Sequence, residues 1–163
     1  MGAGKSTVAR ALANQLNAKC IDLDDFITDR EGRTPEQIIG MEGEQQFRQI
    51  ESAALERALN STEAQVIAAG GGAWTVGINR RLIAQHGATT VWLNVPFELC
   101  WQRIEQADYS RPMAPTREAA EELYETRYPL YDLAEVHIDV GADESPEQIA
   151  KKIASVLKEN SNS

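Results

Sequence analysis

The first residues of the chain have the types and the spacing of a phosphate-binding loop. Gly2-Ala3-Gly4-Lys5-Ser6-Thr7 directly precedes a helical pattern and matches the end of the motif G-x-x-x-x-G-K-[ST]. In such a loop, backbone N–H groups surround a polyphosphate, the lysine reaches the β and γ phosphates, and the next hydroxyl ligates Mg²⁺. The alternative is a chance GKS sequence in a helix-opening turn. The good helical pattern that follows favours phosphate binding.

Two carboxylates follow the next β-rich run of the chain, Lys19–Asp22. Asp22 and Asp24 can both project from the carboxyl edge of a sheet, where open α/β folds bind their ligands. One carboxylate could hold Mg²⁺ through water, and the other could accept a proton from a substrate hydroxyl. The alternative is an acidic helix start that Asp24 or Asp25 merely caps. Next to a phosphate-binding loop, we favour the chemical interpretation.

Three glycines and one charged pair fit either a site or ordinary structure. Gly70-Gly71-Gly72 follows a buried strand, where either a ligand closely approaches the backbone or the chain makes a flexible turn. Arg48 and Glu51 lie three residues apart on one expected helix. By itself, that spacing indicates a surface ion pair.

Two more arginines lie in the C-terminal half of the chain. Arg111 belongs to residues 107–116, a polar stretch with two prolines and no periodicity, which is typical of a surface loop and suits a mobile lid. An arginine there either covers a transferred phosphate or is simply solvated. Arg127 lies near a helix end, where a cation would also compensate the helix dipole.

Short β-rich runs alternate with longer helical patterns along the chain. The runs at 65–69 and 89–94 are almost continuously apolar, as expected for strands covered on both faces. The alternation predicts an α/β fold, with a parallel sheet and helices on both of its faces. We expect strands at Lys19–Asp22, Gln65–Ala69, Thr89–Asn94 and Val136–Val140, and helices at Lys5–Asn17, Leu23–Glu31, Glu42–Asn60, Gly77–His86, Pro96–Gln106, Arg117–Tyr128 and Pro146–Lys158.

Length and composition limit the class of protein. The chain has 163 residues, of which 42% are hydrophobic and 25% charged, as in one folded soluble domain. A net charge of -9 argues against nucleic-acid binding, and no apolar run approaches the ~18 residues of a membrane span. Without a secretory signal pattern, we expect a cytoplasmic protein. We also expect it to be a monomer. Its single domain would cover residues 1–158, with a lid at about 107–116 and a frayed tail at 159–163.

Taken in order, these motifs resemble the shikimate kinase family. GAGKST, D-L-D, EGEQQFRQIE, GGG, RP and RYPLY follow one another over nearly the whole chain. This ordered set is much more specific than the phosphate-binding loop alone. The resemblance implies a three-layer P-loop kinase fold with strand order 2-3-1-4-5. It also implies transfer of the γ-phosphoryl group of ATP, with Mg²⁺, to the 3-hydroxyl of shikimate, a step of chorismate and aromatic amino-acid biosynthesis.

The resemblance implies how the nucleotide and the metal are bound. Gly2 to Thr7 would hold ATP, with Lys5 acting in catalysis. Ser6 would ligate Mg²⁺ with Asp22 beside it. Arg111 would reach the phosphates from the lid and take part in catalysis, and Pro146 would line the adenine.

The resemblance also implies how shikimate is held. Asp24 would bind its hydroxyls and serve as the catalytic base. Arg48 and Arg127 would hold its carboxylate, because arginine pairs bidentately with a planar carboxylate. Gly71 and Gly72 would contact it through their backbone.

Three features depart from the family pattern. The sequence contains neither the first strand, which is central in that order, nor the first glycine of the phosphate-binding loop. Met113 follows Arg111-Pro112 where the family usually has leucine, and the lid looks short. Two other functions stay open: a kinase for another small polyol acid such as gluconate, which leaves Arg48 and Arg127 unexplained as a set, and an inactive nucleotide-binding remnant.

Overall fold

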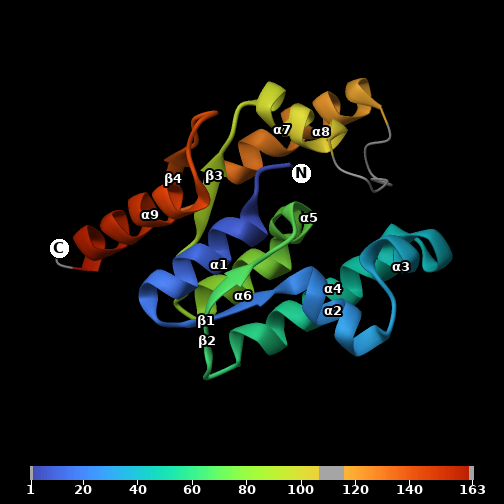
Figure 1. Cartoon of the computed structure of the whole chain (residues 1–163). Coiled ribbons are helices and arrows are strands. Elements are labelled where there is room, and N and C mark those ends of the chain that lie inside the picture. Colours follow the sequence, from blue (N-terminus) through green and yellow to red (C-terminus); the bar gives the residue numbers. More distant parts are fainter. Residues whose placement is uncertain (1, 107–115, 162–163) are drawn as a thin grey trace.

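A computed structural model of the chain describes residues 2–106 and 116–161. In these ranges no helix is both long and apolar enough to cross a membrane. Helices and strands alternate as expected (Figure 1). The strands are β1 (Lys19–Asp22), β2 (Ala64–Ala68), β3 (Val91–Asn94) and β4 (Val136–Asp139); the helices are α1 (Lys5–Leu16), α2 (Leu23–Glu31), α3 (Pro35–Glu42), α4 (Glu44–Leu59), α5 (Gly71–Thr75), α6 (Gly77–Gln85), α7 (Phe97–Glu105), α8 (Arg117–Tyr131) and α9 (Pro146–Ser161).

Two of these helices, α3 and α5, are absent from the sequence-based expectation. The helix expected from Glu42 begins instead at Glu44, because Gly43 adopts a φ of 86° and separates α3 from α4. Helix α3 starts with a capping box, in which Thr34 and Gln37 each bond the other's backbone N–H through a side chain. Such a reciprocal cap is a recognised start signal for a helix.

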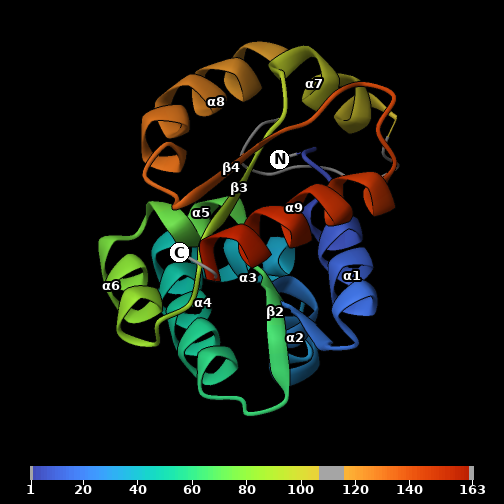
Figure 2. The same ribbon diagram turned by 90° about the vertical axis from the view of Figure 1, so that its left-hand side faces the viewer.

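The described strands form two separate parallel pairs. β1 pairs with β2, and β3 pairs with β4; Figure 2 shows β3 and β4 lying side by side. The pairs correspond to strands 2-3 and 4-5 of the expected order. No described strand occupies the position between them.

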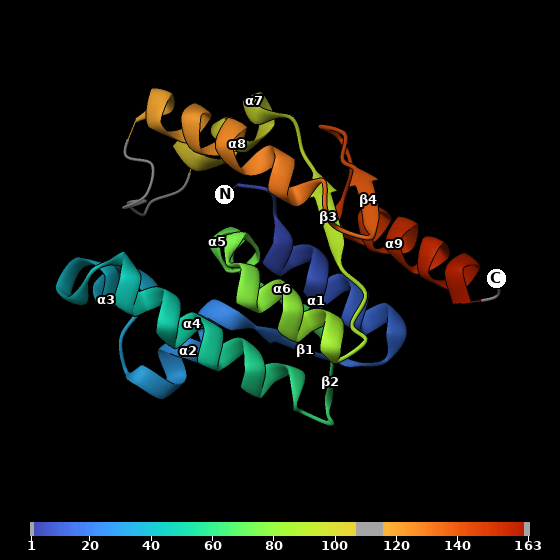
Figure 3. The same ribbon diagram turned by 180° about the vertical axis from the view of Figure 1, so that it is seen from behind.

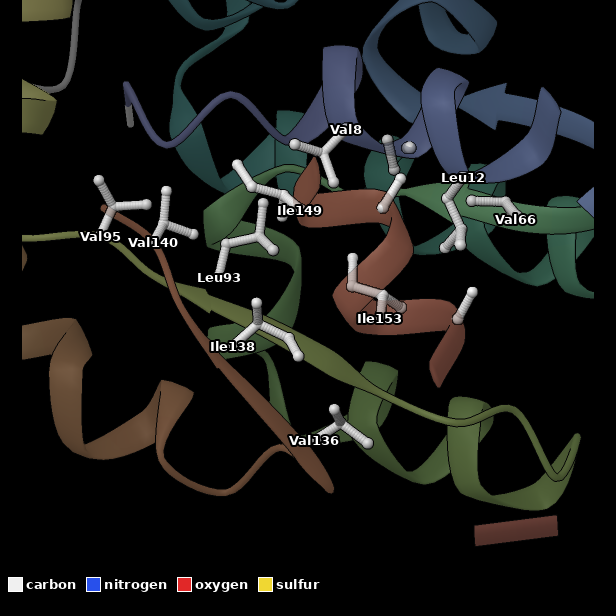
Figure 4. Packing of buried hydrophobic residues seen from close by; sticks show 14 of the residues in the cluster. Val8, Leu12, Val66, Leu93, Val95, Val136, Ile138, Val140, Ile149 and Ile153 are labelled. Atoms are coloured by element: carbon white, nitrogen blue, oxygen red, sulfur yellow. The ribbon is translucent and has the colours of Figure 1, made fainter. Parts of the chain in front are cut away.

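One hydrophobic core joins both strand pairs through two helices. Val8 and Leu12 of α1 and Ile149 and Ile153 of α9 pack with apolar residues of β2, β3 and β4 (Figure 4). Among these strand residues is Val66. Helix α1, which follows the glycine loop, is therefore fixed along its buried side.

A second core lies on the other face of β2. Val66 and Ala68 belong to the first core, whereas Ile67 and Ala69 pack against the second one, which is formed mainly by α2, α3 and α4. The strand is thus covered on both faces, which confirms the expected layers. Figures 1 and 3 show α2, α3 and α4 at one end of the molecule and α7 and α8 at the other, with the start of α1 between them.

Candidate functional site

The glycine loop before α1 adopts a backbone that favours glycine. Gly2 has a φ of 66°, and Gly4, the N-cap of α1, has a φ of 79°; both values are in the left-handed region. A methyl group on Gly2 would overlap the carbonyl of Cys100 in α7. Arg103 in the same helix donates from Nη1 to the Gly2 carbonyl over 3.2 Å. Helix α7 therefore braces the loop.

The start of α1 favours negative charge. Its first turn contains no acidic residue, and a helix N-terminus presents N–H groups and the positive end of the helix dipole. Lys5 and Ser6 both lie in this turn and are half-buried. The geometry suits a polyphosphate at the place the motif predicts.

Asp22 ends β1 and caps α2. One of its carboxylate oxygens accepts from the backbone N–H of Asp24 over 3.1 Å, so the cap is neither Asp24 nor Asp25, the two residues weighed from the sequence. At the surface, Asp25 Oδ2 lies 2.9 Å from Arg10 Nη2. The carboxylate of Asp24 does not cap the helix and lies near Gly70.

The surroundings of Asp24 make it a better base. Asp24 is exposed as a whole residue, yet the protein atoms that partly desolvate its carboxylate raise its pKa above the ordinary value. The negative charge of Asp22 raises this pKa further, and Lys5 acts in the opposite direction. A carboxylate with a raised pKa accepts a proton more readily. The coupling also places Asp24 within electrostatic reach of the lysine of the phosphate-binding loop.

Arg48 and Glu51 form an ion pair between a half-buried guanidinium and a buried carboxylate, so the alternative of a mere surface pair is wrong. Arg48 Nη1 lies 2.6 Å from Glu51 Oε2, and its Nη2 lies 2.9 Å from Glu44 Oε1. The Glu51 side chain is only 1% exposed. A spacing of three residues shows that two side chains meet, but it does not show which face of the helix they share.

Burial and charge act against each other in this pair. Burial opposes the charge on Arg48, but Glu51 and Glu44 outweigh it and raise the pKa of the guanidinium. The pKa of Glu51 is raised overall, because burial outweighs the opposing effect of the positive charges on Arg48 and Arg127. Arg48 therefore stays positively charged, and its two ion pairs hold the guanidinium in one position.

The three glycines bring these groups together. A methyl group on Gly70 would lie 3.0 Å from a carboxylate oxygen of Glu51 and 3.6 Å from one of Asp24. A methyl group on Gly72 would overlap the Arg48 guanidinium. Residues Gly70-Gly71-Gly72, the glycine turn, open helix α5 instead of forming a flexible loop. Their lack of side chains leaves room for the charged groups of the site.

The end of α8 covers the same glycine turn. A methyl group on Gly71 would lie 3.6 Å from Nη1 of Arg127 and would overlap the hydroxyl of Tyr131. That hydroxyl donates to the Gly71 carbonyl over 3.2 Å. Burial raises the pKa of Tyr131, so the hydroxyl keeps its proton and remains a donor.

Other expected site residues are placed less closely or not at all. Arg111 and the rest of the lid at 107–115 lie outside the described residues. Pro146 begins α9, which packs against α1. Within the described ranges, no group of three or more His, Cys, Asp or Glu residues is arranged to hold a metal ion.

Glu51 is the residue whose burial the spacing to Arg48 did not predict. It follows Phe47 by four residues and precedes Ala54 by three, and both of those are buried. This spacing places Glu51 on the apolar stripe of α4. The stripe is the signal that could have predicted its burial.

The fold and the site define a P-loop phosphotransferase. A glycine loop opens α1, whose Lys5 is electrostatically coupled to Asp24, and Asp22 ends β1 two residues before Asp24. Arg48 and Arg127 gather on the adjacent glycine turn. Phosphoryl transfer depends mainly on such positioning and on neutralisation of charge.

Comparisons with known proteins identify the family. The shikimate kinase family model matches residues 1–158. The shikimate kinase of Ruegeria pomeroyi is 35% identical over 160 residues, covering 96% of this chain and 80% of that protein. The shikimate kinase of Moorella thermoacetica is 37% identical over 160 residues, covering 97% and 90%. The chain belongs to the shikimate kinase family.

Solved structures agree with this assignment. Shikimate kinase from Acinetobacter baumannii in complex with shikimate superposes with a TM-score of 0.90 at 34% identity, covering 98% of this chain and 89% of that one. The enzyme from Aquifex aeolicus gives a TM-score of 0.80 at 28% identity, covering 99% and 93%. The expected fold class, kinase activity and family resemblance are confirmed.

Proposed function

We propose that this chain transfers the γ-phosphoryl group of ATP to the 3-hydroxyl of shikimate, in chorismate and aromatic amino-acid biosynthesis. The observation that carries the proposal is the gathering of Asp24, Arg48 and Arg127 around the glycine turn. A base and two arginines fit a compact substrate that combines a reactive hydroxyl with a carboxylate. The family assignment supports the same substrate.

On the nucleotide side, residues Gly2 to Thr7 bind the phosphates of ATP. Lys5 neutralises charge on the β and γ phosphates. Ser6 and Asp22 fit Mg²⁺, because a hydroxyl and a carboxylate are oxygen donors and Mg²⁺ needs few protein ligands. When bound, Mg²⁺ neutralises the phosphate charge that develops during transfer. Arg111 reaches the phosphates from the lid, and Pro146 lines the adenine.

On the acceptor side, the substrate carboxylate binds Arg48 and Arg127. Arg48 is preorganised for this role by its ion pairs with Glu51 and Glu44. Backbone groups of Gly71 and Gly72 contact the substrate. Asp24 accepts the proton of the 3-hydroxyl as the oxygen of that hydroxyl attacks the γ-phosphorus and ADP leaves. We also propose that the chain acts as a cytoplasmic monomer, with one domain over residues 1–158.

Substrate-dependent ADP release tests the function. The purified chain is assayed with Mg-ATP and shikimate, gluconate or common nucleoside monophosphates. We expect turnover with shikimate to exceed turnover with each of the others. Equal or faster turnover with gluconate would reject the substrate assignment, since a polyol acid without the ring would then satisfy the site.

A further inference from the structure

The backbone carbonyls of helix α5 are bonded by side chains, most of them from neighbouring helices. It has only five residues, Gly71–Thr75, and four of its consecutive carbonyls each accept a hydrogen bond from a side chain. The four pairs, donor first, are Tyr131 Oη to Gly71 over 3.2 Å, Thr75 Oγ1 to Gly72 over 2.7 Å, Asn79 Nδ2 to Ala73 over 2.9 Å, and Arg80 Nη1 to Trp74 over 2.6 Å.

The sequence of α5 does not explain its helical form. Gly71 and Gly72 open it, and glycine is among the least favourable helix residues. An isolated helix of this length is unstable in water. Its shape and orientation therefore come from contacts with α4, α6 and α8, the helices around it in Figures 1 and 2.

Asn79 is a buried polar side chain that donates one hydrogen bond to α5. The residue is fully buried in α6. Its Nδ2 bonds the Ala73 carbonyl, whereas its Oδ1 has no partner among the described residues. An apolar residue of similar shape would avoid burying Oδ1 without a partner, but it would also remove the side-chain donor to the Ala73 carbonyl. Within the described part of the chain, the one hydrogen bond that this amide makes is therefore its bond to α5.

We infer that Thr75, Asn79 and Arg80 are positioning residues of the acceptor site, acting through the glycine turn. The inference rests on the proposed function, in which backbone groups of Gly71 and Gly72 contact shikimate. The Arg48 guanidinium lies directly against Gly72. A rotation of α5 would therefore displace the backbone contacts and Arg48 together. The phosphate-binding loop, which is braced by α7, would stay in place.

Matched substitutions separate this role from a general effect on folding. Thr75→Val removes the hydroxyl but keeps the shape, and Thr75→Ser keeps the hydroxyl. Asn79→Leu removes the amide, and Arg80→Lys keeps the positive charge but replaces the planar guanidinium with one ammonium nitrogen. Arg81→Ala is the control, because Arg81 is an exposed neighbour on α6 with no place in the site.

Steady-state kinetics with each substrate varied in turn give the result. We expect Thr75→Val and Asn79→Leu to raise the KM for shikimate about tenfold, in keeping with the large cost of small displacements in an active site. The KM for ATP should stay unchanged, Arg80→Lys should have a smaller effect, and Thr75→Ser and Arg81→Ala should resemble the parent chain.

The outcomes distinguish the inference from the proposed function. If the parent chain releases no ADP with shikimate, the proposed function itself fails. If the parent is active and Thr75→Val keeps its KM for shikimate, or raises both KM values equally, the positioning role is rejected. Circular dichroism melts accompany every variant. If Asn79→Leu does not fold, the Thr75 pair decides, and a Thr75→Val chain that also fails to fold would mean that these donors support only the fold.

Discussion

Adjacent carboxylates in this site have different surroundings. Asp25 points to the surface, where its side chain is 70% exposed and pairs with Arg10. Asp24 faces Gly70 and is coupled to Asp22 and Lys5. Since a base must reach the proton that it removes, we expect Asp24, and not Asp25, to take that proton.

Asp24→Asn is therefore expected to lower kcat by about 10²–10⁴-fold, the usual contribution of a general base, with little change in the KM for ATP. Asp25→Asn is the matched control and should keep nearly the full rate. The helix cap survives both changes because Asp22 supplies it. Comparable kcat values for the two variants would show that Asp24 is not the base.

The two acidic partners of Arg48 should differ in their effect on stability. Glu51 is buried, whereas the Glu44 side chain is 44% exposed. Glu51→Gln should reduce the free energy of unfolding by about 1–3 kcal/mol, because it removes a buried countercharge while Arg48 keeps Glu44. Glu44→Gln should cost less than about 1 kcal/mol. Urea unfolding measures both values, and equal losses would contradict the burial argument.

At the level of elements, the sequence predicts most of the fold and most of the site. All four strands were expected, and the gathering of Asp24, Arg48 and Arg127 follows from the carboxyl edge of the sheet and from the family resemblance. Helix α3 was missed although its capping box is readable. Helix α5 could not have been predicted from its own residues, because side chains outside it, from Asn79 and Arg80 nearby to the distant Tyr131, bond its carbonyls.

The contact between the glycine loop and α7 gives a prediction about two neighbouring glycines. Both have positive φ, so an alanine at either position is strained by about 1–2 kcal/mol. Only at Gly2 would the new methyl group overlap a backbone atom, the carbonyl oxygen of Cys100; at Gly4 the nearest atom is Nη1 of Arg103, 3.7 Å away. Gly2→Ala should therefore raise the KM for ATP more than Gly4→Ala does.

Substrate-varied kinetics check this pair, with the KM for shikimate as the internal control. That value should change little in either variant, because the residues of the proposed acceptor site lie on α2, α4, α5 and α8. A larger rise in the KM for ATP with Gly4→Ala than with Gly2→Ala would mean that contact with α7 does not restrict the conformation of the loop.

At the scale of the whole molecule, the residues of the proposed phosphate and acceptor sites belong to two groups of elements. The core shared by α1, α9 and the strands holds the phosphate-binding loop. The second core, built mainly from α2, α3 and α4, positions Arg48 through the packing of α4. Catalysis therefore depends on how firmly the strand pairs hold these groups together.

The two strand pairs are bridged by α1 and α9 packing but share no backbone hydrogen bonds among the described strands. In the family order, a parallel strand lies between β2 and β3, where it would bond to both and bury apolar side chains on both faces. Each buried backbone group that gains a partner avoids about 1–3 kcal/mol. Each buried apolar side chain contributes about 1.5–3 kcal/mol.

Extending the chain upstream with an apolar strand and the first glycine of the loop should therefore raise the Tm by about 10 °C or more, since 1 kcal/mol shifts the Tm of a domain this size by about 2–4 °C. The extension should also enlarge the Tm shift that Mg-ATP produces, because the loop that orients Lys5 and Ser6 would then be anchored at both ends. Thermal melts of both chains, with and without Mg-ATP, measure these effects. An upstream segment of the same length with the apolar residues replaced by serine is the control. Equal Tm values and equal ATP-induced shifts would show that α1 and α9 alone are sufficient to hold the two halves of the sheet.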